Sequence, residues 1–142
     1  MLLHASCVVL NGKAVLLAGP PGVGKSDVAL RLIVDGGAQL LSDDQTALRL
    51  ENAVLIASPP PVIEGIIEIR HVGLAKMPFA ASAPVALYVE LTASGEGLER
   101  LPERDSVFFL DRLVERLRLP SFAASTPAKI RAALAYSFKS DV

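Results

Sequence analysis

The sequence predicts an α/β fold in which a mixed β-sheet is flanked by helices. A buried strand at residues 14–18 leads through a glycine-rich loop into a helix at residues 27–35. Further short β-rich runs are separated by turn signals, and an amphipathic helix follows residue 126. The 142 residues suffice for a proper core, so we expect a single domain over residues 1–142.

Composition argues against several function classes. The net charge is −1, so no general attraction to nucleic acid or to an anionic membrane is expected. No apolar run approaches the ~18 residues of a membrane-spanning helix. Cys7 is the only cysteine, which rules out an internal disulfide and makes a reducing cytoplasm the expected location. We interpret Cys7 as a small core residue rather than a nucleophile.

The first two strands are predicted to form a hairpin. Residues 4–10 are β-rich, the Asn-Gly pair at 11–12 is a strong turn signal, and residues 13–18 form the return strand. With a two-residue turn, paired positions sum to 23, which places His4 opposite Gly19. A functional role beside the following loop is the preferred interpretation of His4, and an ordinary surface residue is the alternative.

The loop after this hairpin matches the phosphate-binding pattern G-x-x-x-x-G-K-[ST] at every specified position. Its residues are Gly19, Pro20, Pro21, Gly22, Val23, Gly24, Lys25 and Ser26. The glycines permit a tight turn whose N–H groups can point at phosphate oxygens. Lys25 can reach the outer phosphates, the Ser26 hydroxyl can ligate Mg²⁺, and the positive end of the next helix favours an anion.

Two adjacent aspartates are predicted to return to the level of this loop. The helix rises ~16 Å, and the strand at residues 38–42 returns ~16 Å. A right-handed crossover would lay that strand in parallel beside the first one. Side chains alternate along a strand, so only one of Asp43 and Asp44 is expected to face the nucleotide directly. We interpret that residue as a Mg²⁺-ordering or proton-accepting carboxylate, with a solvated turn as the alternative.

The middle of the chain supplies more strands. Residues 46–57 are typical of a hairpin with its turn at 51–52, and the prolines at 59–61 break the chain. Residues 63–70 alternate, which places Glu68 and Arg70 on one face and Ile67 and Ile69 on the other. From the pattern alone, an exposed ion pair and a functional pair are equally open. Residues 71–73 follow this run, and residues 74–84 are then predicted to form a loop.

The last third is predicted to end in a helix. Residues 85–91 are an apolar run typical of a central strand, and residues 106–110 favour a strand. Residues 113–119 fit a strand or a helix about equally well. Thr126 is expected to cap the final helix with Pro127 in its first turn, and Ile130, Leu134 and Phe138 would form its apolar stripe.

These motifs together indicate phosphoryl transfer. The reaction needs charge neutralisation, a metal ion, and a group that orients or deprotonates the acceptor. The loop with Lys25 and Ser26, the aspartate pair and His4 supply those groups. The pattern therefore indicates a kinase-type site rather than a nucleotide holder.

On these residues the chain resembles the catalytic C-terminal domain of HPr kinase/phosphorylase, and is most similar to its short proteobacterial form. The similarity rests on His4 ahead of the first strand, the loop, the aspartate pair, and residues 67–73, which match the signature I-E-[IV]-R-G-[LV]-G. His71 stands where the family has glycine. The family's late proline- and arginine-rich segment has no clear counterpart, the nearest stretch being residues 118–122.

The resemblance implies a P-loop kinase fold of the HPr kinase and phosphoenolpyruvate carboxykinase-like type. It implies ATP and Mg²⁺ as cofactors, an HPr-type phosphocarrier protein as the substrate phosphorylated on serine, and a homo-oligomer, which is a hexamer in that family. Dephosphorylation of the carrier is the family's reverse reaction, and together the two regulate the phosphotransferase system.

The resemblance also assigns roles to residues. Lys25 would be catalytic, and Ser26 and Glu68 would be magnesium ligands. Aligning on the aspartate pair gives Asp44 the role of proton acceptor, with Asp43 as the alternative, and His4 would support the site. A small-molecule P-loop kinase and a non-enzymatic nucleotide-dependent regulator stay open as other functions.

Overall fold

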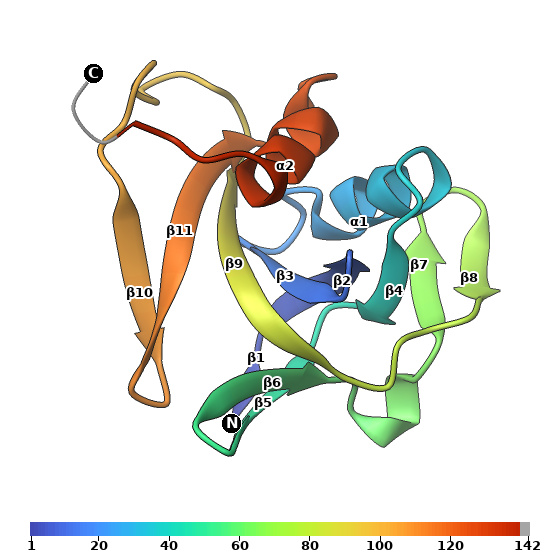
Figure 1. Cartoon of the computed structure of the whole chain (residues 1–142). Coiled ribbons are helices and arrows are strands. Elements are labelled where there is room, and N and C mark those ends of the chain that lie inside the picture. The colour runs from blue at the N-terminus through green and yellow to red at the C-terminus, as the bar shows by residue number, and fades with distance from the viewer. Residues whose placement is uncertain (140–142) are drawn as a thin grey trace.

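The computed structural model describes residues 1–139 and has a mixed α/β architecture (Figure 1). Its elements, in chain order, are β1 (Leu2–Leu3), β2 (Ala5–Leu10), β3 (Lys13–Ala18), α1 (Lys25–Val34), β4 (Gln39–Ser42), β5 (Thr46–Glu51), β6 (Val54–Ser58), the 3₁₀ turn η1 (Pro61–Ile63), β7 (Ile66–Ile69), β8 (Gly73–Lys76), β9 (Ala83–Thr92), β10 (Asp105–Phe109), β11 (Arg112–Pro120) and α2 (Thr126–Ala135). The predicted α/β class with a mixed sheet is confirmed.

Strand β9 connects the whole sheet. The strand order is β1-β5-β6-β9-β3-β2-β4, with β11 also on β9 and β10 outside β11. β9 pairs in parallel with β3 and β11, and its first two residues pair antiparallel with β6. The predicted central position of residues 85–91 is therefore confirmed, and the undecided segment 113–119 is a strand.

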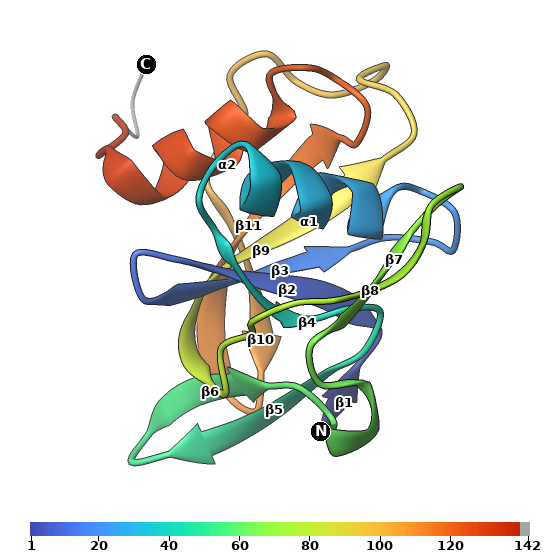
Figure 2. The same ribbon diagram turned by 90° about the vertical axis from the view of Figure 1, so that its right-hand side faces the viewer.

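The core lies on both faces of β3. Val15 and Leu17 pack toward α1, whereas Leu16 packs on the opposite face in a cluster with Cys7. Figure 2 shows α1 and α2 side by side over one face of the sheet, with β5 and β6 on the other side. Each fully buried leucine contributes roughly 2 kcal/mol of hydrophobic stabilisation. Burial raises the pKa of the Cys7 thiol, as fits the core residue predicted from the sequence.

The β2–β3 hairpin has the predicted register, from Leu10 opposite Lys13 to Ala5 opposite Ala18. The strand at 38–42 differs from the prediction. β4 runs parallel to β3, but it pairs antiparallel with β2 instead of lying beside β3. The reason is that β2 and β9 already occupy the two edges of β3.

The predicted loop at residues 74–84 is wrong in part, because β8 pairs with β7 to form a separate two-stranded hairpin. His71 lies in its turn with a φ of 70°, a left-handed conformation that closes the turn. The second predicted hairpin is confirmed as β5 and β6, although its turn is at Asn52 and Ala53 rather than at 51–52.

The predicted start and apolar stripe of the last helix need correction. The N-cap residue of α2 is Ser125, and the hydroxyl of Thr126 instead donates a hydrogen bond to the carbonyl oxygen of Pro120. Thr126 therefore ties the helix to β11. The helix ends at Ala135 because the next residue is extended, so Phe138 lies beyond it and is exposed.

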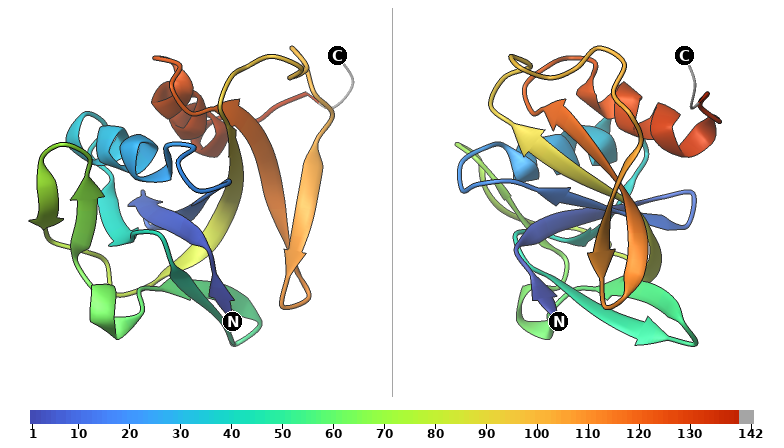
Figure 3. Two further views of the ribbon diagram at one scale, coloured as in Figure 1. Left: turned by 180° about the vertical axis from the view of Figure 1, so that it is seen from behind. Right: turned by 90° about the vertical axis from the view of Figure 1, so that its left-hand side faces the viewer.

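The β10–β11 hairpin extends from the rest of the molecule, as the left view in Figure 3 shows. Its edge strand β10 has no further partner among the sheet strands of residues 1–139. Within the same residues, no helix has the length and apolar character needed to cross a bilayer.

Candidate functional site

The 19–26 loop connects β3 to α1 and depends on its glycines. Gly22 and Gly24 have φ values of 81° and 111°, and Gly24 is the N-cap residue of α1. A Cβ atom on Gly19 would lie 2.8 Å from Cγ1 of Val23 and 3.0 Å from the carbonyl oxygen of Leu91. Both the conformation and the close contacts therefore require glycine here.

Lys25 is folded back across this loop. Lys25 is only 7% exposed, and its Nζ donates hydrogen bonds to the carbonyl oxygens of Gly19 at 2.9 Å and Pro20 at 3.3 Å. The loop thus holds a buried ammonium group next to its own backbone. A group of this charge on a glycine-rich turn is suited to phosphate oxygens.

Asp43 joins three elements through its carboxylate. Oδ1 accepts hydrogen bonds from Ser6 Oγ at 2.8 Å and Ser26 Oγ at 2.7 Å, and Oδ2 accepts one from the backbone N–H of Glu68 at 3.0 Å. Asp43 follows β4, while its partners lie on β2, α1 and β7. The bonds fix the position of Ser26 relative to β4 and β7.

Asp44 has a different environment from its neighbour. Its backbone is left-handed, with a φ of 68°, and its N–H donates to Ser6 Oγ at 3.0 Å. Its carboxylate lies 3.5 Å from His4 Nε2, and the two side chains are 63% and 55% exposed. Asp43 is therefore enclosed and structurally bound, whereas Asp44 and His4 face solvent beside the loop.

Glu68 reaches this group through its backbone. Its N–H binds Asp43, and the residue itself is exposed at the outer face of β7, where Ile67 points into the core. The structure thus brings His4, Ser26, Asp43 and Asp44 together by direct contacts. It places the Glu68 backbone in the same group, with the side chain on the solvent side.

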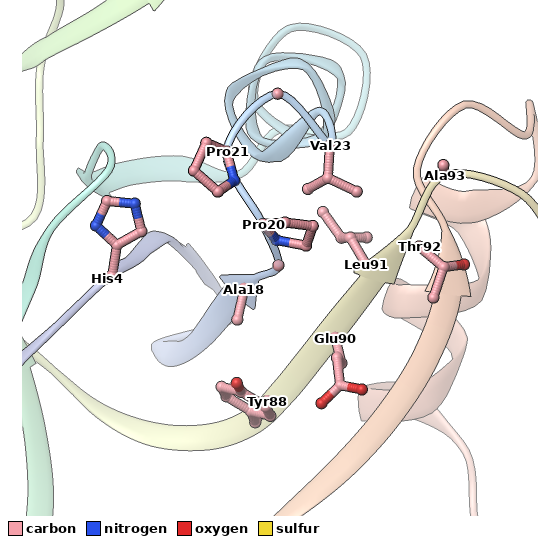
Figure 4. A pocket seen from close by; sticks show the side chains of 12 residues that line it. His4, Ala18, Pro20, Pro21, Val23, Tyr88, Glu90, Leu91, Thr92 and Ala93 are labelled. Carbon is pink, nitrogen blue, oxygen red and sulfur yellow. The ribbon is translucent and has the colours of Figure 1, made fainter.

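A depression of about 710 Å³ adjoins the loop. Figure 4 shows that Pro20, Pro21 and Val23 lie over it, that His4 borders it, and that Tyr88 and Glu90 project from β9. Burial raises the pKa of the Tyr88 hydroxyl, and the nearby Glu90 carboxylate adds to this rise.

An ion-pair network continues from this depression across β11. Arg116 binds Asp105 at 2.7 Å, and Arg118 binds both Asp105 at 3.1 Å and Glu90 at 3.3 Å. The hydrogen bonds from Arg116 hold the pKa of the Asp105 carboxyl below its usual range. Arg118, in the stretch nearest to the family's arginine-rich segment, is thus engaged with carboxylates on the sheet.

Sequence reasoning missed Ser6, which contacts both aspartates. One signal for it was available, because a serine in an otherwise apolar strand is a polar group that needs partners when buried. It also missed Tyr88 and Glu90, because the apolar run at residues 85–91 predicts only a central strand.

Comparisons with known proteins give a consistent result. The family model described as HPr Serine kinase C-terminal domain matches residues 1–139. An HPr kinase/phosphorylase of Bacillus pumilus is 34% identical over 129 residues, which cover 83% of this chain and 41% of that protein. One of Geobacillus is 35% identical over 128 residues, with coverage of 82% and 41%.

A solved structure is also similar. The structure of the Hpr(Ser) kinase/phosphatase from Coxiella burnetii has a TM-score of 0.83 and 28% sequence identity, and the match covers 95% of this chain and 88% of that one. The chain spans about two fifths of the length of the curated relatives it matches (41%). With a family model that matches nearly the whole sequence, this chain belongs to the HPr serine kinase C-terminal domain family.

Proposed function

We propose that this chain is a P-loop kinase that transfers the γ-phosphoryl group of ATP to a serine hydroxyl of an HPr-type phosphocarrier protein. The observation that carries the proposal is the pair of adjacent aspartates in two environments. Asp43 is bound to Ser26 of the loop, and Asp44 stands next to His4 in the open. Such a division fits one carboxylate that organises the nucleotide side and one that serves the acceptor.

The phosphate side of the reaction falls to the 19–26 loop. Its backbone N–H groups and Lys25 bind the β- and γ-phosphates and stabilise the charge that develops during transfer. Lys25 would exchange its bonds to the Gly19 and Pro20 carbonyls for bonds to phosphate oxygens.

The acceptor side falls to Asp44 and His4. The serine oxygen forms a bond to the γ-phosphorus as the bond from that phosphorus to the bridging oxygen breaks, and ADP leaves with the electron pair. The proton of the serine hydroxyl passes to Asp44. His4 lies 3.5 Å from this carboxylate and orients it. His4 is also the alternative to Asp44 as the group that accepts the serine proton.

The donor set fits Mg²⁺, a cation that prefers hydroxyl, carboxylate and phosphate oxygens. Ser26 and Glu68 would hold it, and Asp43 would orient Ser26. Because Ser26 gives its hydrogen to Asp43, its oxygen keeps its lone pairs for a cation. Bound together with the nucleotide, Mg²⁺ would offset phosphate charge.

Two features support a protein as the acceptor. The depression at the loop and a second one lined by residues 68–74 are open to solvent rather than enclosed. A small metabolite is usually bound in a pocket that buries most of its surface. An acceptor serine presented on a protein surface can reach Asp44 without such a pocket.

The proposal also includes a cytoplasmic location for this chain and its assembly into a homo-oligomer.

A phosphotransfer assay tests this function. Purified chain, Mg²⁺, γ-labelled ATP and an HPr-type carrier are mixed, with Lys25→Met and Asp44→Asn as variants whose folding is checked by circular dichroism. Label on a carrier serine, lost in both folded variants, is the expected result. Label on a metabolite instead of the carrier would favour the small-molecule kinase. Tight ATP binding without transfer to any acceptor, unchanged in Asp44→Asn, would favour the regulator.

A further inference from the structure

An exposed aromatic side chain lies directly against the 19–26 loop. Phe122, in the connection between β11 and α2, is 63% exposed. A Cβ atom built on Gly24 would lie 3.0 Å from its Cζ and 3.2 Å from its Cε1. One edge of the ring is therefore in contact with the last glycine of the loop, while most of the residue stays open to solvent.

The backbone on both sides of this ring is held firmly. Ser121 is fully buried, and its N–H and Oγ donate to the carbonyl oxygen of Thr92 at 2.9 and 3.2 Å. Arg31 of α1 donates to the carbonyl oxygens of Ser121 and Ala123, the latter at 3.1 Å. A large apolar group on a fixed backbone is thus presented to solvent, where it gains little from hydration.

The strand order shows on which side of the 19–26 loop Phe122 lies, relative to the carboxylates of Asp43 and Asp44. The parallel strands β3, β9 and β11 end at the same edge, so the 19–26 loop and Phe122 lie at that edge. β11 lies two strands from β3 on one side, and β4, which Asp43 and Asp44 follow, lies two strands away on the other. In the proposed function the γ-phosphate lies near Asp44, so the opposite end of a bound nucleotide would extend toward Phe122.

We propose that Phe122 is the platform on which the nucleobase of the bound nucleotide stacks. This inference rests on the proposed function, since it needs a nucleotide in the 19–26 loop. Stacking on an aromatic ring accepts any base, because every base presents a π-face. Phe122 would therefore strengthen the binding of nucleoside triphosphates in general over that of inorganic polyphosphate.

The test compares ATP with inorganic tripolyphosphate, which has the phosphates but no base. Phe122→Ala is expected to raise the Kd for Mg²⁺–ATP by about 5- to 150-fold and to leave the Kd for tripolyphosphate unchanged. Phe108→Ala is the matched control, because Phe108 is 69% exposed on β10, away from the loop. It should alter neither Kd.

A second variant reads the contact directly. The chain contains no tryptophan, so Phe122→Trp introduces a single tryptophan as the fluorescent reporter. Its emission should change on addition of Mg²⁺–ATP and stay constant with tripolyphosphate. An emission that responds equally to both ligands would contradict stacking by the base.

The outcomes separate this inference from the proposed function. If Phe122→Ala weakens both ligands equally, or neither, while Lys25→Met weakens both, the loop binds phosphate but Phe122 does not hold the base. If Phe122→Ala leaves ATP binding intact and weakens only binding of the carrier protein, the ring is a protein contact and the inference fails. If the unaltered chain binds neither ligand, both the inference and the proposed function fail.

Discussion

Replacing each of the two adjacent aspartates by asparagine should have unequal consequences for stability, large for Asp43 and small for Asp44. Asp43 is 9% exposed, and three donors converge on its two oxygens. An asparagine has one acceptor oxygen, so at least one of these donors loses its partner. Asp44 makes one contact to His4 at 3.5 Å and is largely exposed.

The magnitude follows from the hydrogen bonds. Loss of a bond to a charged, enclosed acceptor costs about 1.5–3 kcal/mol, so Asp43→Asn should lower the free energy of unfolding by roughly 2 kcal/mol. With an m-value near 2 kcal/mol per molar urea, the unfolding midpoint should fall by about 1 M. Asp44→Asn should stay within about 0.5 kcal/mol, since asparagine also tolerates a left-handed backbone.

Equilibrium urea unfolding followed by circular dichroism measures both changes. Because the two substitutions are chemically identical and adjacent, each serves as the control for the other. Equal destabilisation by both, or a larger effect of Asp44→Asn, would refute the assignment of Asp43 as the structural centre of the site.

Three further outcomes are expected. Gly19→Ala should destabilise the fold by more than about 1 kcal/mol and abolish ATP binding, because the added Cβ would lie 2.8 Å from a side-chain carbon of Val23. Gly12→Ala is the control and should keep ATP binding, because the space around Gly12 is open. Urea unfolding measures the stability of both variants, and calorimetry measures their ATP binding. The Cys7 thiol, whose pKa is raised by burial, should resist alkylation in the native protein and react after unfolding, as mass spectrometry would record. Arg116 lowers the pKa of Asp105, so in Arg116→Gln this pKa should return toward its usual range, as NMR titration would measure. The stabilisation that this carboxylate gives is present above its unfolded-state pKa and is lost as the pH falls through its lower folded-state pKa.

The parts of the structure that could be predicted are those set by local sequence. The Asn-Gly turn fixes the β2–β3 register, so the position of His4 near the end of β3 follows from counting residues. The 19–26 loop was predicted because its glycine spacing is a local sequence pattern. The positive φ values of its glycines show the left-handed backbone conformation that favours this residue. The return of the aspartates to the loop likewise followed from the lengths of a helix and a strand.

The parts that could not be predicted depend on contacts between distant segments. Ser6 binds Asp43 across 37 residues of sequence, and side-chain alternation alone does not say which strand lies opposite which. The prediction that the strand at residues 38–42 lies beside β3 was wrong for the same reason. Phe122 could not be placed, because the strand that positions it has an ambiguous period. The capping role predicted for Thr126 is wrong, because its hydroxyl donates to the carbonyl oxygen of Pro120 instead.

The most direct test of the central claim is the rate of a single turnover. Enzyme saturated with Mg²⁺–ATP is mixed with an HPr-type carrier, and label on the carrier serine is followed for the unaltered chain and for Asp44→Asn. The account predicts rapid transfer by the unaltered chain and a rate about 10²- to 10⁴-fold lower in Asp44→Asn, with the Kd for ATP unchanged. Transfer at the full rate in Asp44→Asn would contradict the role of this carboxylate, and no transfer by the unaltered chain would contradict the kinase function itself.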